Sequence, residues 1–416
     1  MNIEQLESNV KSYCRQYPTV FNKACGAILT DQDGREFIDF FSGAGTLNYG
    51  HNNPEFKQAL IEYIQNDGIT HGLDFTTTAK NEFMASLNNN ILKPRGLEYK
   101  IQFTGPTGTN AVEAAFKIAR NVTGRHNIIA FTRSFHGVSM GALAATANNH
   151  YREASGLPLT GVTFMPFDGY LGEQINTVDY LEKVISDTSS GTDFPAAILV
   201  ETIQAEGGVN VANIEWLQAL SALCNKHKIL LIIDDIQVGC GRTGTFFSFE
   251  HADINPDIVL LSKSLSGYGL PLSIVLLKPE LDKWKAGQHN GTFRGNNLAF
   301  VTAKTAIERY WQDNSFSETV TAKGDLLADT LNAIAVKFKQ QNFEVRGRGM
   351  IQAIDLKDGG LAQKVVTAGF ENGLIIENCG ADGCVLKCIP PLNISNELLE
   401  QGLEKLEKCI AQALQT

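Results

Sequence analysis

The feature that most constrains this chain is a series of short apolar runs that alternate with helical stretches between residues 55 and 310. Each run is four to six residues long, a length that suits a strand and is too short for a buried helix. Strands that alternate with helices pair in parallel through right-handed crossovers, so the pattern predicts a layered α/β domain. The predicted strands are 127–131, 196–201, 229–234, 258–261 and 273–277.

The segments on both sides of this region have different patterns. Residues 3–16 are predicted to form a helix, and residues 26–41 hold two apolar stretches around an Asp33-Gly34 turn, which is a hairpin signal. Residues 322–340 are amphipathic and precede short strands and a last helix. We therefore expect three parts, namely an N-terminal segment (1–54) that packs with the small domain, a large α/β domain (55–314) and a C-terminal small α+β domain (315–416).

The charge balance and the cysteines limit the classes of partner. Lys and Arg number 35 against 45 for Asp and Glu, and a net charge of -10 disfavours nucleic acid and anionic membranes, so we expect small-molecule partners. No apolar run approaches the roughly 18 residues of a membrane span, and residues 1–7 do not resemble a signal peptide, so we expect a cytoplasmic protein. The 8 cysteines are interpreted as reduced thiols, and the spacing of Cys379, Cys384 and Cys388 predicts no metal site.

A carboxylate ends one of the predicted buried strands. Asp234 follows Ile232-Ile233 directly, and ligands of parallel sheets bind beyond the carboxyl ends of the strands. Asp234 could simply cap the next turn, which is the commoner case. It could also pair with a cationic ring nitrogen of a cofactor.

The next predicted strand is followed by a lysine. Lys263 comes two residues after Leu261, and the small residues of a glycine-containing turn, Ser264 to Gly267, follow it. A lysine in this place is more often a surface residue whose stem covers apolar atoms. Its position one strand after Asp234 favours instead an amine that condenses with an aldehyde cofactor and later moves a proton at the substrate.

One loop is suited to a phosphate group. Thr107, Gly108 and Thr109 stand just before an amphipathic stretch, 111–120, so a phosphate there would meet free N–H groups and the positive end of a helix dipole. An ordinary loop with a threonine cap explains this segment equally well. The loop has neither a GxGxxG nor a Walker pattern, which disfavours dinucleotides and triphosphates.

An aromatic residue and a histidine follow the strand 127–131. Phe135 belongs in a core by default, but it could stack on a planar cofactor ring while Ile236 covers the opposite face. His136 lies beside it in the sequence. These residues alone do not decide between the two interpretations.

Together these segments resemble the class III aminotransferases, the family of ornithine and 4-aminobutyrate aminotransferases. The resemblance runs along nearly the whole chain and implies pyridoxal phosphate as cofactor and its fold type I, with a large, mainly parallel α/β/α domain and a smaller α+β domain. The matching motifs are Gly50-His51-Asn52-Asn53-Pro54, Thr107-Gly108-Thr109, Phe135-His136-Gly137, Glu201 to Gly208, Asp234 to Gly244, Lys263, Gly291-Thr292-Phe293 and Val345-Arg346-Gly347.

The resemblance implies a role for each matching residue at the cofactor. Lys263 would hold the aldehyde, Asp234 would pair with the ring nitrogen, and Gln237 would donate a hydrogen bond to the phenolic oxygen. The remaining cofactor residues that it implies are Thr107, Gly108, Thr109, Phe135, His136 and Ile236.

The resemblance also implies how subunits and substrates are arranged. Thr292 would reach the phosphate from the neighbouring subunit, which implies a homodimer or a dimer of dimers. Glu201, Glu206 and Arg346 would lie at the substrate. Glu206 and Arg346 would form an ion pair that opens when a substrate carboxylate takes the place of the glutamate, although a fixed salt bridge is the simpler alternative.

Two positions depart from relatives in the family and bear on the substrate. Val138 stands where several ω-aminotransferases have an arginine for a substrate carboxylate, and Ala44 stands where ornithine-specific members have an aromatic residue. The runs Phe40 to His51 and Gly373 to Asn378, with Lys387-Cys388, look closer to the branch that moves an amino group from glutamate to aspartate 4-semialdehyde, giving 2,4-diaminobutyrate, in ectoine biosynthesis. The alternatives are another ω-aminotransferase, acting on 4-aminobutyrate, lysine, ornithine or acetylornithine, an aminomutase, or a cofactor-binding protein without turnover.

Overall fold

The computed structural model describes residues 6–415, and its largest sheet has seven strands in the order β4-β12-β11-β10-β7-β5-β6. The five strands from β11 to β6 pair in parallel, whereas β12 pairs antiparallel with both β11 and β4. Their bounds are β4 (Lys100–Phe103), β5 (Ile128–Phe131), β6 (Val162–Met165), β7 (Ala197–Val200), β10 (Leu230–Asp234), β11 (Ile258–Leu261) and β12 (Ile274–Leu277).

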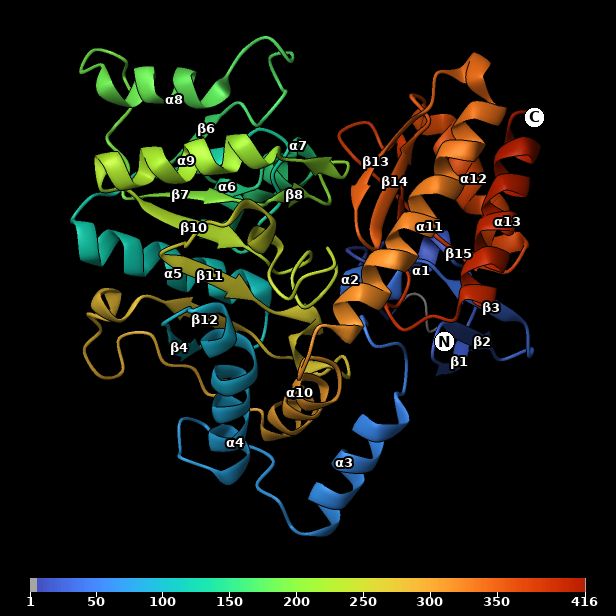
Figure 1. Cartoon of the computed structure of the whole chain (residues 1–416), viewed down its shortest axis with the longest axis horizontal. Coiled ribbons are helices and arrows are strands. Elements are labelled where there is room, and N and C mark those ends of the chain that lie inside the picture. Colours follow the sequence, from blue (N-terminus) through green and yellow to red (C-terminus); the bar gives the residue numbers. More distant parts are fainter. Residues whose placement is uncertain (1–5, 416) are drawn as a thin grey trace.

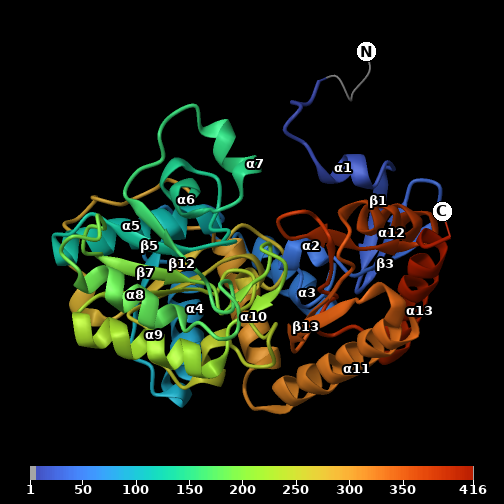
Figure 2. The ribbon, with the colours of Figure 1, turned by 90° about the horizontal axis from the view of Figure 1, so that it is seen from above.

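Both faces of this sheet are buried, because successive side chains point to opposite sides of a strand. On β10, Ile232 packs with one group of helices and Ile233 with the other. Figure 2 shows the sheet between these two layers. One layer contains α5 (Gly108–Thr123) and α6 (Met140–Ala145), and the other contains α8 (Thr177–Ser186), α9 (Ile214–His227), α4 (Thr78–Ser86) and α10 (Asn297–Tyr310).

All five predicted strands of this sheet are confirmed to within two residues, but two features were not predicted. The strand 273–277 was expected to pair in parallel and does not. A parallel return needs a crossover of about a dozen residues, usually through an α-helix, and the connection from β11 to β12 contains only a short 3₁₀ turn at Lys263–Ser266. The edge strands β4 and β6 also escaped prediction, because neither is a continuous apolar run: polar residues interrupt both.

Two four-stranded sheets form the part of the molecule on the right in Figure 1. The strands β1 (Phe21–Cys25), β2 (Ile28–Asp31) and β3 (Glu36–Asp39) join β15 (Leu374–Ile375), so the first and last parts of the chain share a sheet. A second sheet has the order β13 (Glu344–Arg348), β14 (Ile351–Asp355), β17 (Val385–Cys388) and β16 (Glu377–Cys379). A two-stranded sheet contains β8 (Ile203–Gln204) and β9 (Asn210–Val211).

Helices complete this part and link it to the large sheet. The long amphipathic stretch is confirmed as α11 (Ser315–Lys337), which packs on β13 and β14. Its Gly324 permits a close approach, since a Cβ there would lie 2.6 Å from the backbone of Gly349. The other helices are α2 (Ser42–Gly45), α3 (Pro54–Gln65), α7 (Asn149–Arg152), α12 (Gly359–Glu371) and α13 (Asn396–Ala413).

The N-terminal predictions had mixed outcomes. The hairpin around Asp33-Gly34 is confirmed, because β2 and β3 pair antiparallel there. The helix over 3–16 is wrong for residues 6–12, since only α1 (Tyr13–Gln16) is helical, and residues 3–5 lie outside the described part. Side chains 6–12 bury almost no apolar area, so nothing repays the cost of ordering a longer helix there.

Candidate functional site

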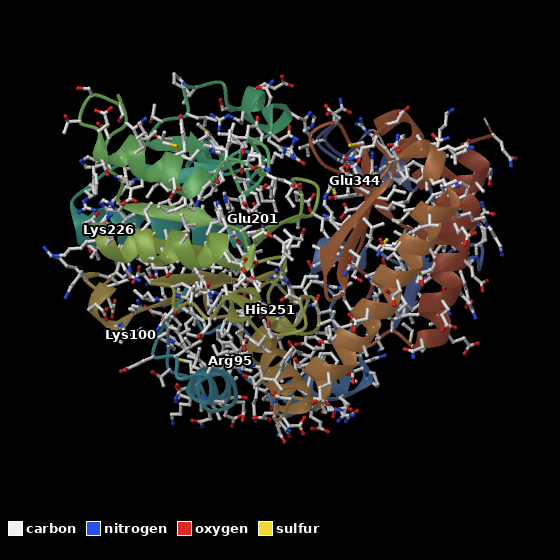
Figure 3. All side chains as sticks on the ribbon, turned by 45° about the horizontal axis from the view of Figure 1, so that its top comes forward. Arg95, Lys100, Glu201, Lys226, His251 and Glu344 are labelled. Carbon is white, nitrogen blue, oxygen red and sulfur yellow. The ribbon has the colours of Figure 1, made fainter. Side chains whose placement is uncertain are left out.

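The carboxyl ends of the parallel strands meet at one cavity of about 170 Å³. Glu201 follows β7, Asp234 ends β10, and Lys263 lies two residues beyond β11. Figure 3 labels Glu201 in the middle of the molecule, between the large sheet and the smaller sheets. The cavity brings together ten of the predicted site residues, namely Gly108, Thr109, Phe135, His136, Glu201, Glu206, Asp234, Ile236, Gln237 and Lys263.

Lys263 is held in a restricted backbone conformation at the base of this cavity. Its φ of 47° is left-handed, which costs free energy in a residue other than glycine. The turn is fixed by the next residue, because the Ser264 hydroxyl donates to the carbonyl of Gly45 at 2.7 Å. Burial lowers the pKa of the Lys263 ammonium, so the side chain gives up its proton more readily than an exposed lysine.

Asp234 is fixed by two contacts at the same end of the sheet. Its Oδ2 lies 2.6 Å from Nδ1 of His136, and its Oδ1 accepts the N–H of Ile236 at 3.2 Å. Burial opposes protonation of His136, but the bond to Asp234 outweighs it and raises the pKa of the imidazole. The buried Nε2 of His136 has no hydrogen-bond partner among the described residues. The contact with His136 therefore fixes the orientation of the Asp234 carboxylate.

Glu201 is a buried carboxyl group behind this pair. Its Oε1 accepts the backbone N–H of Phe135 at 3.0 Å, and Phe135 lines the cavity. Burial raises the pKa of Glu201 to about 7, and the negative charge of Asp234 adds to this effect.

The N-terminus of α5 opens into the cavity at Gly108 and Thr109. The first N–H groups of a helix have no acceptor within the helix, and the Thr107 side chain does not cap them. Its hydroxyl donates instead to Oδ1 of Asn110 at 2.8 Å. Space is tight here, because a Cβ on Gly108 would lie 3.0 Å from Cδ1 of Ile236. The site therefore offers backbone donors to an anion on one side.

Glu206 pairs with a lysine that the sequence analysis did not select. Nζ of Lys387 lies 2.6 Å from Oε1 of Glu206, and Nε2 of Gln237 donates to the same oxygen at 3.1 Å. Burial would raise the pKa of Glu206, but the charge of Lys387 and these bonds lower it to about 2. Glu206 lines the small cavity and also an outer cavity of about 1040 Å³.

The expected ion pair between Glu206 and Arg346 is wrong. Nη1 of Arg346 lies 3.0 Å from Oδ2 of Asp355, and its Nε donates to the carbonyl of Gly208 at 2.8 Å. Arg346 thus finds its partners on β14 and on the loop after β8, while Lys387 occupies the space beside Glu206. The spacing of residues along the chain cannot distinguish these two cations.

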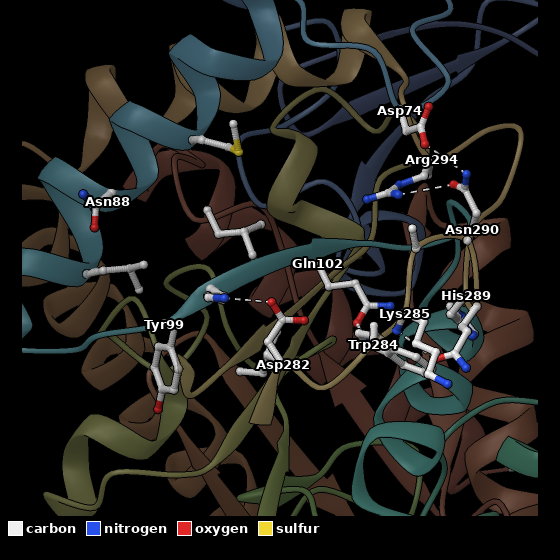
Figure 4. Close-up of a pocket in the computed structure, with 18 of the residues that line it drawn as sticks. Asp74, Asn88, Tyr99, Gln102, Asp282, Trp284, Lys285, His289, Asn290 and Arg294 are labelled. Atoms are coloured by element: carbon white, nitrogen blue, oxygen red, sulfur yellow. Dashed lines mark hydrogen bonds and ion pairs between the residues drawn. The ribbon is translucent and has the colours of Figure 1, made fainter. Parts of the chain in front are cut away.

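Two predicted cofactor residues lie outside the small cavity. Thr107 precedes it as the cap residue of α5. Thr292 lies in an exposed loop, where the His71 ring donates to its carbonyl at 2.8 Å. The neighbouring cavity of about 820 Å³, drawn in Figure 4, is lined by the segment 282–290 and by Arg294, opposite residues of β4 such as Gln102.

Sequence reasoning gave no role to Lys387 or to Glu377 opposite it. A signal was available, because Lys387 stands inside the apolar strand β17, and charged residues are almost never fully buried without a partner. Tyr13 and Tyr151 were not selected either, although burial and the charges of Glu206 and Glu377 raise the pKa of both phenols.

Among residues 6–415, no cluster of three or more His, Cys, Asp or Glu side chains could hold a metal ion. None of the helices in this range has the length and apolar character to cross a membrane.

Comparison with known sequences gives matches along the whole chain. The aminotransferase class-III family model matches residues 11–410. The diaminobutyrate–2-oxoglutarate transaminase of Halomonas elongata is 57% identical, with 99% of this chain and 98% of that protein covered. The enzyme of the same name from Bordetella parapertussis is 55% identical, with 99% and 95% covered.

Solved structures agree with these sequences. An aminotransferase from Bacillus anthracis has a TM-score of 0.86 at 26% identity, with 99% of this chain and 100% of that chain covered. The ornithine aminotransferase of Toxoplasma gondii has a TM-score of 0.83 at 27% identity, with 100% and 99% covered. The expected fold type I architecture is thereby confirmed, and the chain belongs to the class-III aminotransferase family.

Proposed function

We propose that this chain uses pyridoxal phosphate to move an amino group from glutamate to aspartate 4-semialdehyde, giving 2-oxoglutarate and 2,4-diaminobutyrate, as in ectoine biosynthesis. The observation that carries the proposal is the meeting of Lys263, Asp234 and the start of α5 in one cavity. The substrate assignment is supported by relatives 52% to 57% identical over almost the whole chain that bear the name diaminobutyrate–2-oxoglutarate transaminase.

The residues at the cavity fit this cofactor. The uncapped N-terminus of α5 suits its phosphate, and Phe135 and Ile236 provide apolar sides for its ring. Asp234 would pair with the ring nitrogen, and Lys263 would hold the aldehyde carbon. When bound, pyridoxal phosphate supplies an aldehyde that condenses with amines and a ring that stores electrons.

Lys263 is the residue that would move the proton. Once substrate replaces it at the aldehyde, its amine is free to take a proton from one carbon and return it to another. The lowered pKa favours the neutral amine, which is the form that accepts a proton. The left-handed turn and the Ser264 bond keep this amine at a fixed place.

Glu206 and Lys387 would let one site accept two kinds of substrate. A carboxylate of the substrate glutamate would displace Glu206 from Lys387. The side chain of Glu206 would then turn toward the outer cavity that it already lines. 2,4-Diaminobutyrate reacts at its terminal amine, so Glu206 would stay on Lys387 in that half-reaction. Lys387 thus takes the place that the sequence analysis gave to Arg346.

We also propose a homodimer in the cytoplasm. Phe75 and Phe293 are 67% and 68% exposed, which is unusual for aromatic side chains, and each is next in sequence to a residue that lines the cavity of Figure 4, Asp74 or Arg294. A partner subunit would cover this region and bring its Thr292 to the phosphate. The 8 cysteines are all free, which suits a reducing compartment.

Two measurements test the proposal. Reduction of the purified enzyme with borohydride, followed by peptide mapping, should place a pyridoxyl label on Lys263, and the Lys263→Ala variant should lose both label and turnover. Beyond one equivalent per active site, glutamate should be converted to 2-oxoglutarate only when aspartate 4-semialdehyde is present. A label on another lysine would refute the cofactor site. Turnover with ornithine or 4-aminobutyrate but not with glutamate and aspartate 4-semialdehyde would refute the substrate assignment.

A further inference from the structure

Lys387 has a second carboxylate partner, Glu377, which the proposed mechanism does not use. The two residues are directly opposite in the antiparallel pair of β16 and β17, so their side chains lie on the same face of the sheet. Oε1 of Glu377 lies 2.9 Å from Nζ of Lys387. The side chain of Lys387 is 0% exposed and that of Glu377 is 3% exposed, so both charges lie away from water.

The two carboxylates differ in their freedom to move. Glu206 is on a loop that continues through Gly207 and Gly208, its side chain is 23% exposed, and it lines both cavities. Glu377 lies within a strand and lines neither cavity. The hydroxyl of Tyr17 donates to the carbonyl of Ile376 at 2.8 Å, which holds this strand in place. Glu377 therefore stays beside Lys387 when Glu206 leaves.

The charge count shows why the protonation of Glu377 matters. One ammonium and two ionised carboxylates would leave a net negative charge in a buried site, which is costly. Burial raises the pKa of Glu377 to about 7, and the nearby charge of Lys387 offsets this only in part. Below this pH Glu377 is neutral, and Lys387 has a full positive charge for Glu206 or a substrate carboxylate. Above it Glu377 is ionised and already balances the lysine.

We propose that Glu377 is a positioning residue that sets how strongly Lys387 attracts the carboxylate of a dicarboxylic substrate, strongly when Glu377 is protonated and weakly when it is ionised. This inference rests on the proposed role of Lys387 in binding glutamate. It makes glutamate binding fall as the pH rises, without a similar effect on an amine substrate. The charged groups that act on Glu377 from the elements around it are Lys387, Glu206 and Lys263. Burial and the charge of Glu377 in turn raise the pKa of the nearby Cys379, Tyr13, Tyr17 and Tyr151.

The test is the Glu377→Gln variant of the holoenzyme, which keeps the shape and stays neutral. The half-reactions with glutamate and with 2,4-diaminobutyrate would be followed separately from pH 6 to 9 by the change in cofactor absorbance. For the wild type, the ratio of KM for glutamate to KM for diaminobutyrate should rise above pH 7, by up to about tenfold per pH unit. For Glu377→Gln this ratio should stay at its low-pH value. A purely structural role would change both half-reactions equally at every pH.

Two outcomes would overturn the inference. One is a variant whose ratio rises with pH as in the wild type, and the other is a wild-type ratio that stays constant from pH 6 to 9, which can be measured even if the variant does not fold. Failure of the proposed function gives a different result. If diaminobutyrate does not react, the substrate assignment fails, while the pH dependence of glutamate KM in wild type and variant still decides the role of Glu377.

Discussion

At the scale of single residues, two residues adjacent in sequence can have separate roles because their side chains point in opposite directions. Asp234 faces the cavity, whereas Asp235 points away and accepts the N–H of Ser248 at 3.1 Å. Asp234 was correctly predicted to lie at the ligand site, because it directly ends an apolar run. Lys387 could have been noticed as a charge inside an apolar strand, but its role could not be predicted, because its partner Glu206 is 181 positions away and meets it only in the folded chain.

Lys387 should determine the affinity for glutamate. Lys387→Met removes the cation that would bind the substrate carboxylate, so KM for glutamate should rise at least about tenfold, the equivalent of a lost charged hydrogen bond. KM for diaminobutyrate should change much less. Lys387→Arg keeps the charge and is the control. Equal effects of Lys387→Met on both substrates would contradict this role.

Asp235 should make the stability of the cofactor-free protein depend on pH. Burial raises the pKa of Asp235 to about 7, so between its unfolded pKa and pH 7 the folded state binds a proton that the unfolded state has lost. Stability from this group therefore falls as the pH rises, by about 3 kcal/mol between pH 5 and 8 at about 1.4 kcal/mol per unit of pKa shift.

The measurement for Asp235 is urea unfolding at several pH values. Asp235→Asn keeps an acceptor for Ser248 but cannot ionise, so its free energy of unfolding should fall less with pH than that of the wild type. At pH 5, where Asp235 is protonated in the folded wild type, the variant should be no more stable than the wild type. Parallel curves for the two proteins would show that Asp235 does not titrate in this range.

At the scale of elements, local patterns predicted the strands that carry the site and missed what depends on distant parts. Four parallel strands and the start of α5 follow from apolar runs and turn residues, and these elements bring ten site residues together. The direction of β12 depends on the length of a connection, and the charges of β16 and β17 depend on a pairing between strands. Periodicity along the chain contains neither kind of information.

A methyl group added at the start of α5 should leave the stability of the protein nearly unchanged but weaken cofactor binding. Gly108→Ala improves helix propensity by up to about 1 kcal/mol, yet the new Cβ would lie 3.0 Å from Cδ1 of Ile236 at the cavity wall. We expect the unfolding midpoint to change little and the Kd for pyridoxal phosphate to rise about tenfold, equivalent to about 1.4 kcal/mol.

A second substitution tests this cause. Ile236→Val removes Cδ1 but keeps Cγ2, which would lie 3.2 Å from the new Cβ, so Gly108→Ala with Ile236→Val should recover part of the affinity, measured by cofactor titration. If the double variant binds no better than Gly108→Ala alone, the contact with Ile236 is not the reason for the loss.

At the scale of the whole molecule, the site depends on keeping the large sheet and the smaller sheets together, because Lys263 comes from one and Lys387 from the other. One buried side chain spans this junction. Arg242 is fully buried, and its guanidinium donates to the carbonyls of Met350 and Pro390 at 3.0 and 2.5 Å and to Oδ1 of Asn48 at 2.6 Å. It therefore joins residues from the beginning, middle and end of the chain.

Arg242→Met should leave these three acceptors buried without a donor. We expect the free energy of unfolding to fall by about 3–5 kcal/mol, the cost of breaking a buried polar network from one side. Arg309→Met is the matched control, because Arg309 is exposed and its pair with Glu55 should contribute less than about 1 kcal/mol. Urea unfolding followed by Trp fluorescence and by circular dichroism measures both. If Arg242→Met lowers the free energy of unfolding no more than the control does, the junction is held by apolar packing alone, and glutamate turnover should survive the substitution. If it lowers it by the expected amount, turnover should be lost at urea concentrations at which the large sheet is still folded.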